Sequence, residues 1–126
     1  MSAPLGKVIL VADDNADQRA LYVDLLNYNG YRVIEARDGE EAIDRARTES
    51  PALILMDVTM PGTSGWNAVR ALREQAETST IPIIVITGLA QTRDRDASFA
   101  AGSDAYLSKP VAPRRLLEEV RRFLPT

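Results

Sequence analysis

Residues 55–62 (LMDVTMPG) join the end of an expected strand to a turn. An apolar run at 52–56 (ALILM) leads into a single acidic residue, Asp57, and the turn-forming residues Pro61 and Gly62 follow directly. An apolar run of this length between turn signals is typical of a strand that is buried on both faces. Asp57 would then stand at the edge of a sheet. Taken alone, Asp57 is most simply a turn cap.

Four further apolar runs alternate with helical patterns along the chain. Strands are expected at 7–12, 31–36, 52–56, 81–86 and 104–108, and helices are expected to contain residues 21–26, 42–46, 66–72, 89–101 and 116–124. Strands that alternate with helices indicate an α/β fold with a parallel sheet covered on both faces. Because five units are too few to close a barrel, we expect a doubly wound (βα)5 sheet of flavodoxin-like strand order 2-1-3-4-5. One domain would span residues 1–126.

Composition limits the chemistry available to the 126 residues. The chain has no Cys and no His, which excludes disulfides, thiolate nucleophiles and imidazole bases or ligands. The net charge of −3 argues against nucleic acid or an anionic membrane as a partner. No apolar run approaches the roughly 20 residues that span a bilayer, and residues 1–6 do not resemble a secretory signal. We therefore expect a cytoplasmic protein.

Polar side chains gather where the expected strands end. Asp13 and Asp14 follow the first strand, Asp57 the third, Thr87 the fourth, and Ser108 and Lys109 the fifth. Open α/β sheets bind ligands outside the carboxyl ends of their strands, at a switch point that lies between strands one and three in the flavodoxin-like order. We therefore expect three carboxylates to lie together, with a hydroxyl and an ammonium alongside.

Three adjacent carboxylates repel one another and should raise one another's pKa values. Lys109 supplies one compensating charge, and an all-oxygen site of this kind suits Mg²⁺. Simpler interpretations exist for each residue: Asp13 and Asp14 as helix N-caps, Thr87 as a strand-end hydroxyl, Lys109 as a solvated cation. Their joint presence at the ends of the correct four strands favours a site.

Five motifs together resemble the receiver domain of response regulators, the aspartate-phosphorylated half of two-component signalling, and in particular its single-domain chemotaxis regulators. The motifs are VILVADDN at 8–15, DVTMP at 57–61 with Gly65, ITG at 86–88, GSDAY at 102–106 and LSKP at 107–110. The resemblance covers nearly the whole chain. It implies that Asp57 takes a phosphoryl group from a phosphohistidine, or from a small donor such as acetyl phosphate.

The resemblance also implies the roles of the other site residues. Asp14, Asp57 and the backbone carbonyl of Thr59 would hold Mg²⁺, with Asp13 acting through water. Lys109 and Thr87 would bind the phosphoryl oxygens, Tyr106 would move inward on phosphorylation, Gly88 would leave room for the group, and Pro110 would form a cis peptide with Lys109. The simpler alternatives are a surface aromatic at Tyr106 and a trans peptide at Pro110.

Partners follow from the same resemblance. A sensor histidine kinase or a phosphotransfer protein would supply the phosphoryl group, and a target protein or output domain would contact the fourth helix, fifth strand and fifth helix. Arginines 93, 95, 114 and 115 would rim this face, although 114–118, 115–119 and 118–122 are also ordinary i,i+4 helix pairs. We expect a monomer or a weak dimer, because 111–113 (VAP) lacks the aromatic residue of dimerising receivers. Thr59 and Leu89 stand at positions that tune hydrolysis of the acyl phosphate.

Three rival functions are distinguishable from the sequence. A flavodoxin-like cofactor binder needs a glycine- and hydroxyl-rich loop after strand one, where Asp13 and Asp14 stand. A phosphatase with an Asp nucleophile carries a second Asp two residues later, where this chain has Thr59. We therefore expect no turnover of external substrates. A degenerate receiver that binds proteins without phosphorylation is the remaining alternative, although all five site residues are present.

Overall fold

The computed structural model describes residues 7–58, 65–88, 96 and 99–125. Its strands are β1 (Val8–Ala12), β2 (Arg32–Ala36), β3 (Leu53–Asp57), β4 (Ile83–Thr87) and β5 (Ala105–Ser108). Its helices are α1 (Ala16–Tyr28), α2 (Gly39–Glu49), α3 (Gly65–Glu74) and α5 (Pro113–Phe123). Most of the helix expected at 89–101 falls outside the described residues, although 99–101 are helical.

The five strands form one parallel sheet in the order β2-β1-β3-β4-β5. This order and the alternation of strands with helices confirm the predicted doubly wound, flavodoxin-like fold. In register, Ala12 lies beside Met56, Asp57 beside Ile86, and Thr87 beside Ser108. The carboxyl ends of β1, β3, β4 and β5 therefore meet at one edge of the sheet.

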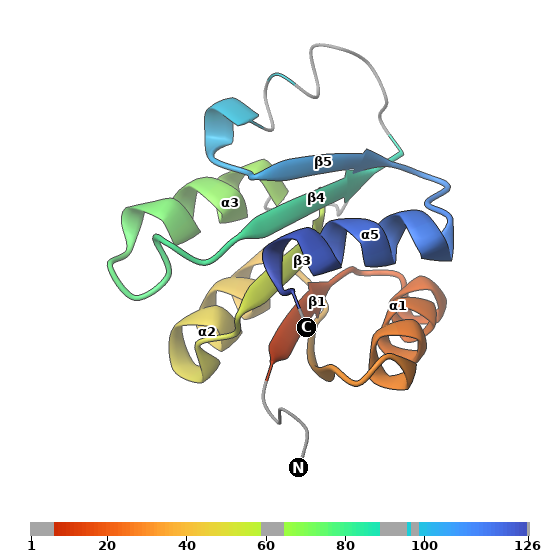
Figure 1. Cartoon of the computed structure of the whole chain (residues 1–126). Coiled ribbons are helices and arrows are strands. Elements are labelled where there is room, and N and C mark those ends of the chain that lie inside the picture. The colour runs from red at the N-terminus through yellow and green to blue at the C-terminus, as the bar shows by residue number, and fades with distance from the viewer. Residues whose placement is uncertain (1–6, 59–64, 89–95, 97–98, 126) are drawn as a thin grey trace.

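Side chains of the central strands alternate between two hydrophobic cores. Leu53 and Leu55 of β3 pack with residues of α1 and α5, whereas Ile54 and Met56 pack with residues of α2 and α3. Figure 1 shows the same arrangement, with α1 and α5 on one side of the sheet and α2 and α3 on the other. Every residue of β3 and β4 is buried, as the continuous apolar runs predicted.

Helix α1 begins at an N-cap residue that the sequence alone did not identify. The side chain of Asn15 accepts a hydrogen bond from the Gln18 N–H, so Asn15 is the N-cap and the interpretation of Asp13 and Asp14 as caps is wrong. Both acidic residues thus stay in the segment that connects β1 to the helix. Leu21, which shares the apolar spacing of α1, is 69% exposed.

Arg73 forms hydrogen bonds at the edge of the sheet opposite to the carboxyl ends of its strands. Its guanidinium donates hydrogen bonds to the carbonyls of Gly102 (2.8 Å), Ile81 (2.7 Å) and Ser79 (3.2 Å), and to Asp104 Oδ2 (2.6 Å). Gly102 has φ +118°, and a Cβ there would lie 2.6 Å from Arg73 Cγ, so glycine is required on both grounds. One side chain thereby joins the end of α3 to the starts of β4 and β5.

Candidate functional site

The functional site lies at the carboxyl edge of the sheet, where β1 and β3 run side by side. Asp57 is the last residue of β3 and only 3% exposed. The sequence predicted that the strand would end one residue earlier, at Met56. Asp13 and Asp14 directly follow β1, the first buried and the second exposed. Carboxylate oxygens of these three residues all lie within 4.8 Å of one another. The predicted acidic cluster is therefore present.

Asp13 is held rigidly in a nearly dry environment. It is 1% exposed, its N–H donates to the Ala36 carbonyl (3.0 Å), and its Oδ1 accepts from the Asn15 N–H (2.9 Å). Its Oδ2 is buried and has no hydrogen-bond partner in the described part of the chain. Burial, followed by the charge of Asp57, raises the pKa of Asp13 from 3.8 to about 6. Desolvation is the larger cause, whereas the expectation from the sequence rested mainly on repulsion in a partly desolvated site.

Lys109 is the positive charge beside the nucleophile candidate. Its Nζ donates to Asp57 Oδ2 at 2.6 Å, and the Lys109 side chain is only 20% exposed. Its backbone N–H donates to the Thr87 carbonyl at 2.8 Å, which fixes the start of the β5–α5 connection against β4. The Lys109–Pro110 peptide is cis. The interpretation of Lys109 as a solvated cation is wrong.

The remaining predicted residues lie on β4 and β5. Thr87 ends β4 and is fully buried. Tyr106 pairs in register with Val85, two residues before Thr87, and packs partly buried against the core under α2 and α3. Val85 belongs to the same core, so Thr87 and Tyr106 face the same side of the sheet. Gly88 follows Thr87, and a Cβ there would meet no described atom within 4 Å.

Some predicted residues fall outside the described part of the chain: Thr59, Leu89, Arg93 and Arg95. On α5, Arg115 pairs with Glu119 (2.6 Å), as the i,i+4 pattern predicted. Arg122 pairs with Glu119 (2.8 Å) rather than with Glu118. Two arginines thus neutralise one buried carboxylate on this helix.

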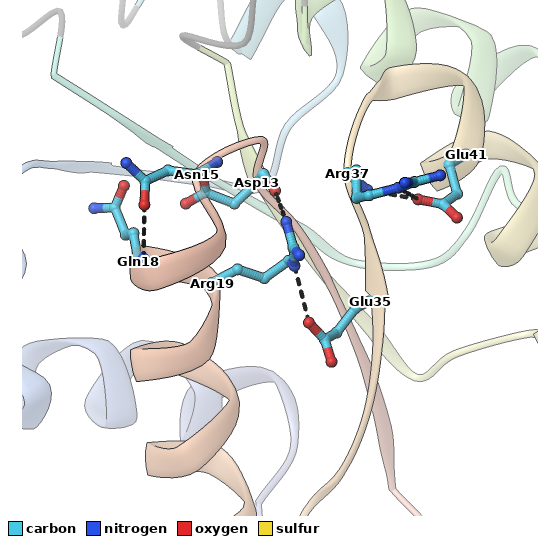
Figure 2. Close-up of polar contacts among 7 residues, drawn as sticks. All are labelled: Asp13, Asn15, Gln18, Arg19, Glu35, Arg37 and Glu41. Carbon is cyan, nitrogen blue, oxygen red and sulfur yellow. Dashed lines mark hydrogen bonds and ion pairs between the residues drawn. The ribbon is translucent and has the colours of Figure 1, made fainter.

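Two residues of α1 that the sequence did not single out belong to the site. Figure 2 shows Arg19 between two partners: it donates to the Asp13 carbonyl (2.7 Å) and pairs with Glu35 on β2 (2.8 Å). Gln18 accepts a hydrogen bond from Lys109 Nζ at 2.9 Å. Their place in the first turn of α1, which starts at this edge, was the available signal. The rotation of α1 about its axis, which turns these side chains toward the site, could not be predicted from the local sequence.

The acidic cluster has the chemistry of a divalent-cation site. Oxygens that bind one Mg²⁺ at about 2.0–2.1 Å lie no more than about 4.2 Å apart. The three carboxylate oxygens lie within 4.8 Å of one another, which is close to this limit, so the cluster fits one such cation. Asp13 Oδ2, which is buried and has no hydrogen-bond partner among the described residues, is a second sign that a positive group belongs here.

Known proteins share this sequence and this fold. The sequence pattern of the response regulator receiver domain matches residues 9–121. The chain is 36% identical over 120 residues to the polar-differentiation response regulator DivK of Brucella ovis, which covers 95% of this chain and 98% of that protein. The Vibrio cholerae chemotaxis protein CheY4 has a TM-score of 0.87 at 31% identity, over 92% of this chain and 97% of that one.

A third relative was solved with a metal ion. It is the receiver domain of the sensor histidine kinase PA1611 from Pseudomonas aeruginosa PAO1, with a magnesium ion coordinated in its active site cleft. Its TM-score is 0.88 at 32% identity, over 96% of this chain and 99% of that one. The fold, the edge site and the sequence match agree: this chain belongs to the response regulator receiver domain family of two-component signalling.

Proposed function

We propose that this receiver accepts a phosphoryl group on Asp57 from the phosphohistidine of a sensor histidine kinase or phosphotransfer protein. The single observation that carries the proposal is the setting of the Asp57 carboxylate. It is 3% exposed, contacts the Lys109 ammonium at 2.6 Å and lies in a cluster with Asp13 and Asp14. The proposed unit is one receiver domain over residues 1–126.

The chain's own residues account for most of the transfer step. An oxygen of Asp57 forms a bond to phosphorus while the P–N bond of the phosphohistidine breaks, and the electron pair returns to the imidazole. The transferred group carries negative charge on its three outer oxygens, so placement and electrostatics dominate its catalysis. Lys109 would bind one of these oxygens and Thr87 another. Gly88 and Pro110 would support the backbone around the group.

Mg²⁺ is the cofactor that the acidic cluster fits. Asp14, Asp57 and the Thr59 carbonyl would hold it directly, and Asp13 through water. When bound, Mg²⁺ supplies positive charge that offsets the three carboxylates and the incoming phosphoryl oxygens. The magnesium in the cleft of the PA1611 receiver supports this assignment by similarity.

A partner would recognise phosphorylation on a face that includes β5 and α5, together with the fourth helix expected at 89–101, most of which lies outside the described residues. A phosphoryl group adds about −1.5 to −2 charge and strong acceptor oxygens beside Thr87. Thr87 would move toward it, and Tyr106, on the same side of the sheet, would follow into the space. A protein partner or output domain would bind the changed face. The structural support for this step is that Tyr106 is only partly buried against its core.

Incubation with acetyl phosphate and Mg²⁺, followed by intact-protein mass, tests the proposal. Wild-type protein should gain the mass of one phosphoryl group, and chelation of Mg²⁺ should prevent this. Asp57→Asn should gain nothing, whereas Asp24→Asn, the same change at an exposed position on α1, should behave as wild type. No adduct on wild type would favour a binding module that acts without phosphorylation. An undiminished adduct on Asp57→Asn would move the acceptor elsewhere.

A further inference from the structure

Gln18 contacts Lys109 from outside the set of residues predicted for the site. Its Oε1 accepts a hydrogen bond from Lys109 Nζ at 2.9 Å, while the same ammonium donates to Asp57 Oδ2 at 2.6 Å. The two partners are 91 positions apart in the sequence and meet because α1 and the β5–α5 connection flank the same edge of the sheet. One ammonium is therefore shared between the nucleophile and a neutral amide.

The amide of Gln18 has a defined orientation. A lysine ammonium only donates hydrogen bonds, so the group that faces it must be the side-chain carbonyl. The amide nitrogen then faces Tyr22, one turn further along α1, and donates to its hydroxyl oxygen at 3.3 Å. Burial, with the charges of Asp13 and Asp57, raises the pKa of Tyr22 to about 12, so this hydroxyl stays neutral. Both ends of the amide are thus engaged.

This arrangement restricts an otherwise flexible side chain. Lysine carries its charge on a four-carbon stem with about 2 kcal/mol of rotamer entropy, and its ammonium has three donors. In the described part of the chain, Asp57 and Gln18 each take one of them, and the third can bind an oxygen of an incoming phosphoryl group. An ammonium that already lies beside Asp57 when the phosphoryl donor binds requires no reorganisation during the reaction.

The geometry points to Gln18 as a positioning residue for phosphoryl transfer to Asp57: its side-chain carbonyl holds the Lys109 ammonium at the nucleophile. Gln18 acts through Lys109, and the inference rests on the proposed function of Asp57. Because Gln18 is neutral, it holds Lys109 without adding a fourth negative charge to the acidic cluster.

Phosphorylation kinetics with acetyl phosphate test the inference. Gln18→Met keeps the length of the side chain but removes the acceptor, and the maximal phosphorylation rate should fall by about ten-fold. The Mg²⁺ affinity and the Tm should stay at wild-type values, because the carboxylates and the core are unchanged. Gln75→Leu, which removes an amide beyond the end of α3 at the opposite edge, should leave the rate unchanged. Gln18→Leu should reproduce Gln18→Met, which guards against an effect of shape.

A double-mutant cycle separates positioning from a general structural role. In a Lys109→Met background, adding Gln18→Met should cause no further loss, because the group through which Gln18 acts is gone. An independent loss would overturn the inference. So would a wild-type rate in both Gln18→Met and Gln18→Leu. Failure of the wild-type protein itself to take up a phosphoryl group would instead refute the proposed function, before any variant is compared.

Nuclear magnetic resonance of the lysine ammonium groups gives a readout that needs no phosphorylation. The chain has two lysines, Lys7 and Lys109, so Lys7 serves as an internal reference. The Lys109 signal should be sharp in wild type and broadened by water exchange in Gln18→Met. Gln18→Glu, which restores an acceptor oxygen, should sharpen it again. An unchanged Lys109 signal in Gln18→Met would contradict the inference.

Discussion

Replacing Asp13 with Asn should stabilise the magnesium-free protein at neutral pH. Asp13 is 1% exposed, and its pKa is raised from 3.8 to about 6, so its charged form is disfavoured in the folded state. A rise of this size corresponds to about 3 kcal/mol of unfolding free energy lost when the carboxyl ionises. Asparagine removes that charge and keeps an oxygen that accepts the Asn15 N–H bond.

The pH window follows from the sign of the shift. Between about pH 4 and 6 the folded state binds more protons at Asp13 than the unfolded state, so wild-type stability falls as pH rises through this range. Asp13→Asn lacks this loss. The unfolding free energy of the variant should therefore equal that of wild type at about pH 4. Above pH 6 it should be about 1–3 kcal/mol higher, which is roughly 3–10 °C in Tm.

Urea denaturation in EDTA at several pH values measures this difference, with Asp14→Asn as the matched control. Asp14 is exposed, so the same substitution should stabilise less. Saturating Mg²⁺ should shrink the gain of the variant, because binding at 100 times Kd adds about 2.7 kcal/mol to wild type and less to the variant. An Asp13→Asn variant that is no more stable than wild type in EDTA at pH 7.5, or that gains equally at pH 4, would contradict a destabilising buried charge at Asp13.

Two further predictions concern the same edge and the opposite one. The apparent Mg²⁺ affinity of wild type, measured by calorimetry, should weaken by up to about ten-fold per pH unit below pH 6, because a proton on Asp13 competes with the cation; Asp13→Asn should show a flatter profile. Arg73→Ala should lower the unfolding free energy by about 2–4 kcal/mol, since four hydrogen bonds from one guanidinium are lost. Arg70→Ala, on the exposed side of the same helix, should cost less than about 0.5 kcal/mol in the same denaturation assay. Equal losses in the two variants would contradict a stabilising role of the Arg73 hydrogen bonds.

The fold was predictable because its signals are local and repeated. Five apolar runs alternate with helical patterns, and parallel strands place their carboxyl ends at one edge. That rule alone brought Asp13, Asp57 and Lys109 together from three distant segments. Strand limits differed by one or two residues, as at β4, which begins at Ile83 rather than at residue 81. Such ends depend on pairing with neighbours and not on the strand's own residues.

Contacts made by long side chains were not predictable. Gln18, Arg19 and Arg73 reach partners that are remote in the sequence, and their aim depends on how each helix is rotated on the sheet. Leu21 illustrates the same limit. At about 100° per residue, Leu21 lies at one end of the apolar stripe of α1 and the buried Leu26 at the other, with the partly buried Leu25 and Tyr22 between them. Spacing identifies a stripe but not which of its edges faces solvent.

Capping was ambiguous for a chemical reason. Asp13, Asp14 and Asn15 are all good N-cap residues, and sequence alone does not choose among them. In the structure Asn15 caps α1, which leaves both acidic side chains to the cluster. The choice of Asn15 as the N-cap therefore also determines that Asp13 and Asp14 are available to the acidic cluster.

Chemical trapping of the acyl phosphate identifies the phosphorylated residue directly. Protein treated with acetyl phosphate and Mg²⁺ is reduced with borohydride, which converts a phosphorylated aspartate to homoserine, and the digested peptides are sequenced by mass spectrometry. We predict homoserine at position 57, in a yield that depends on Mg²⁺ and falls strongly in Lys109→Met. Homoserine at Asp13 or Asp14 instead, or none at any position in wild type, would contradict the assignment of Asp57 as the phosphoacceptor.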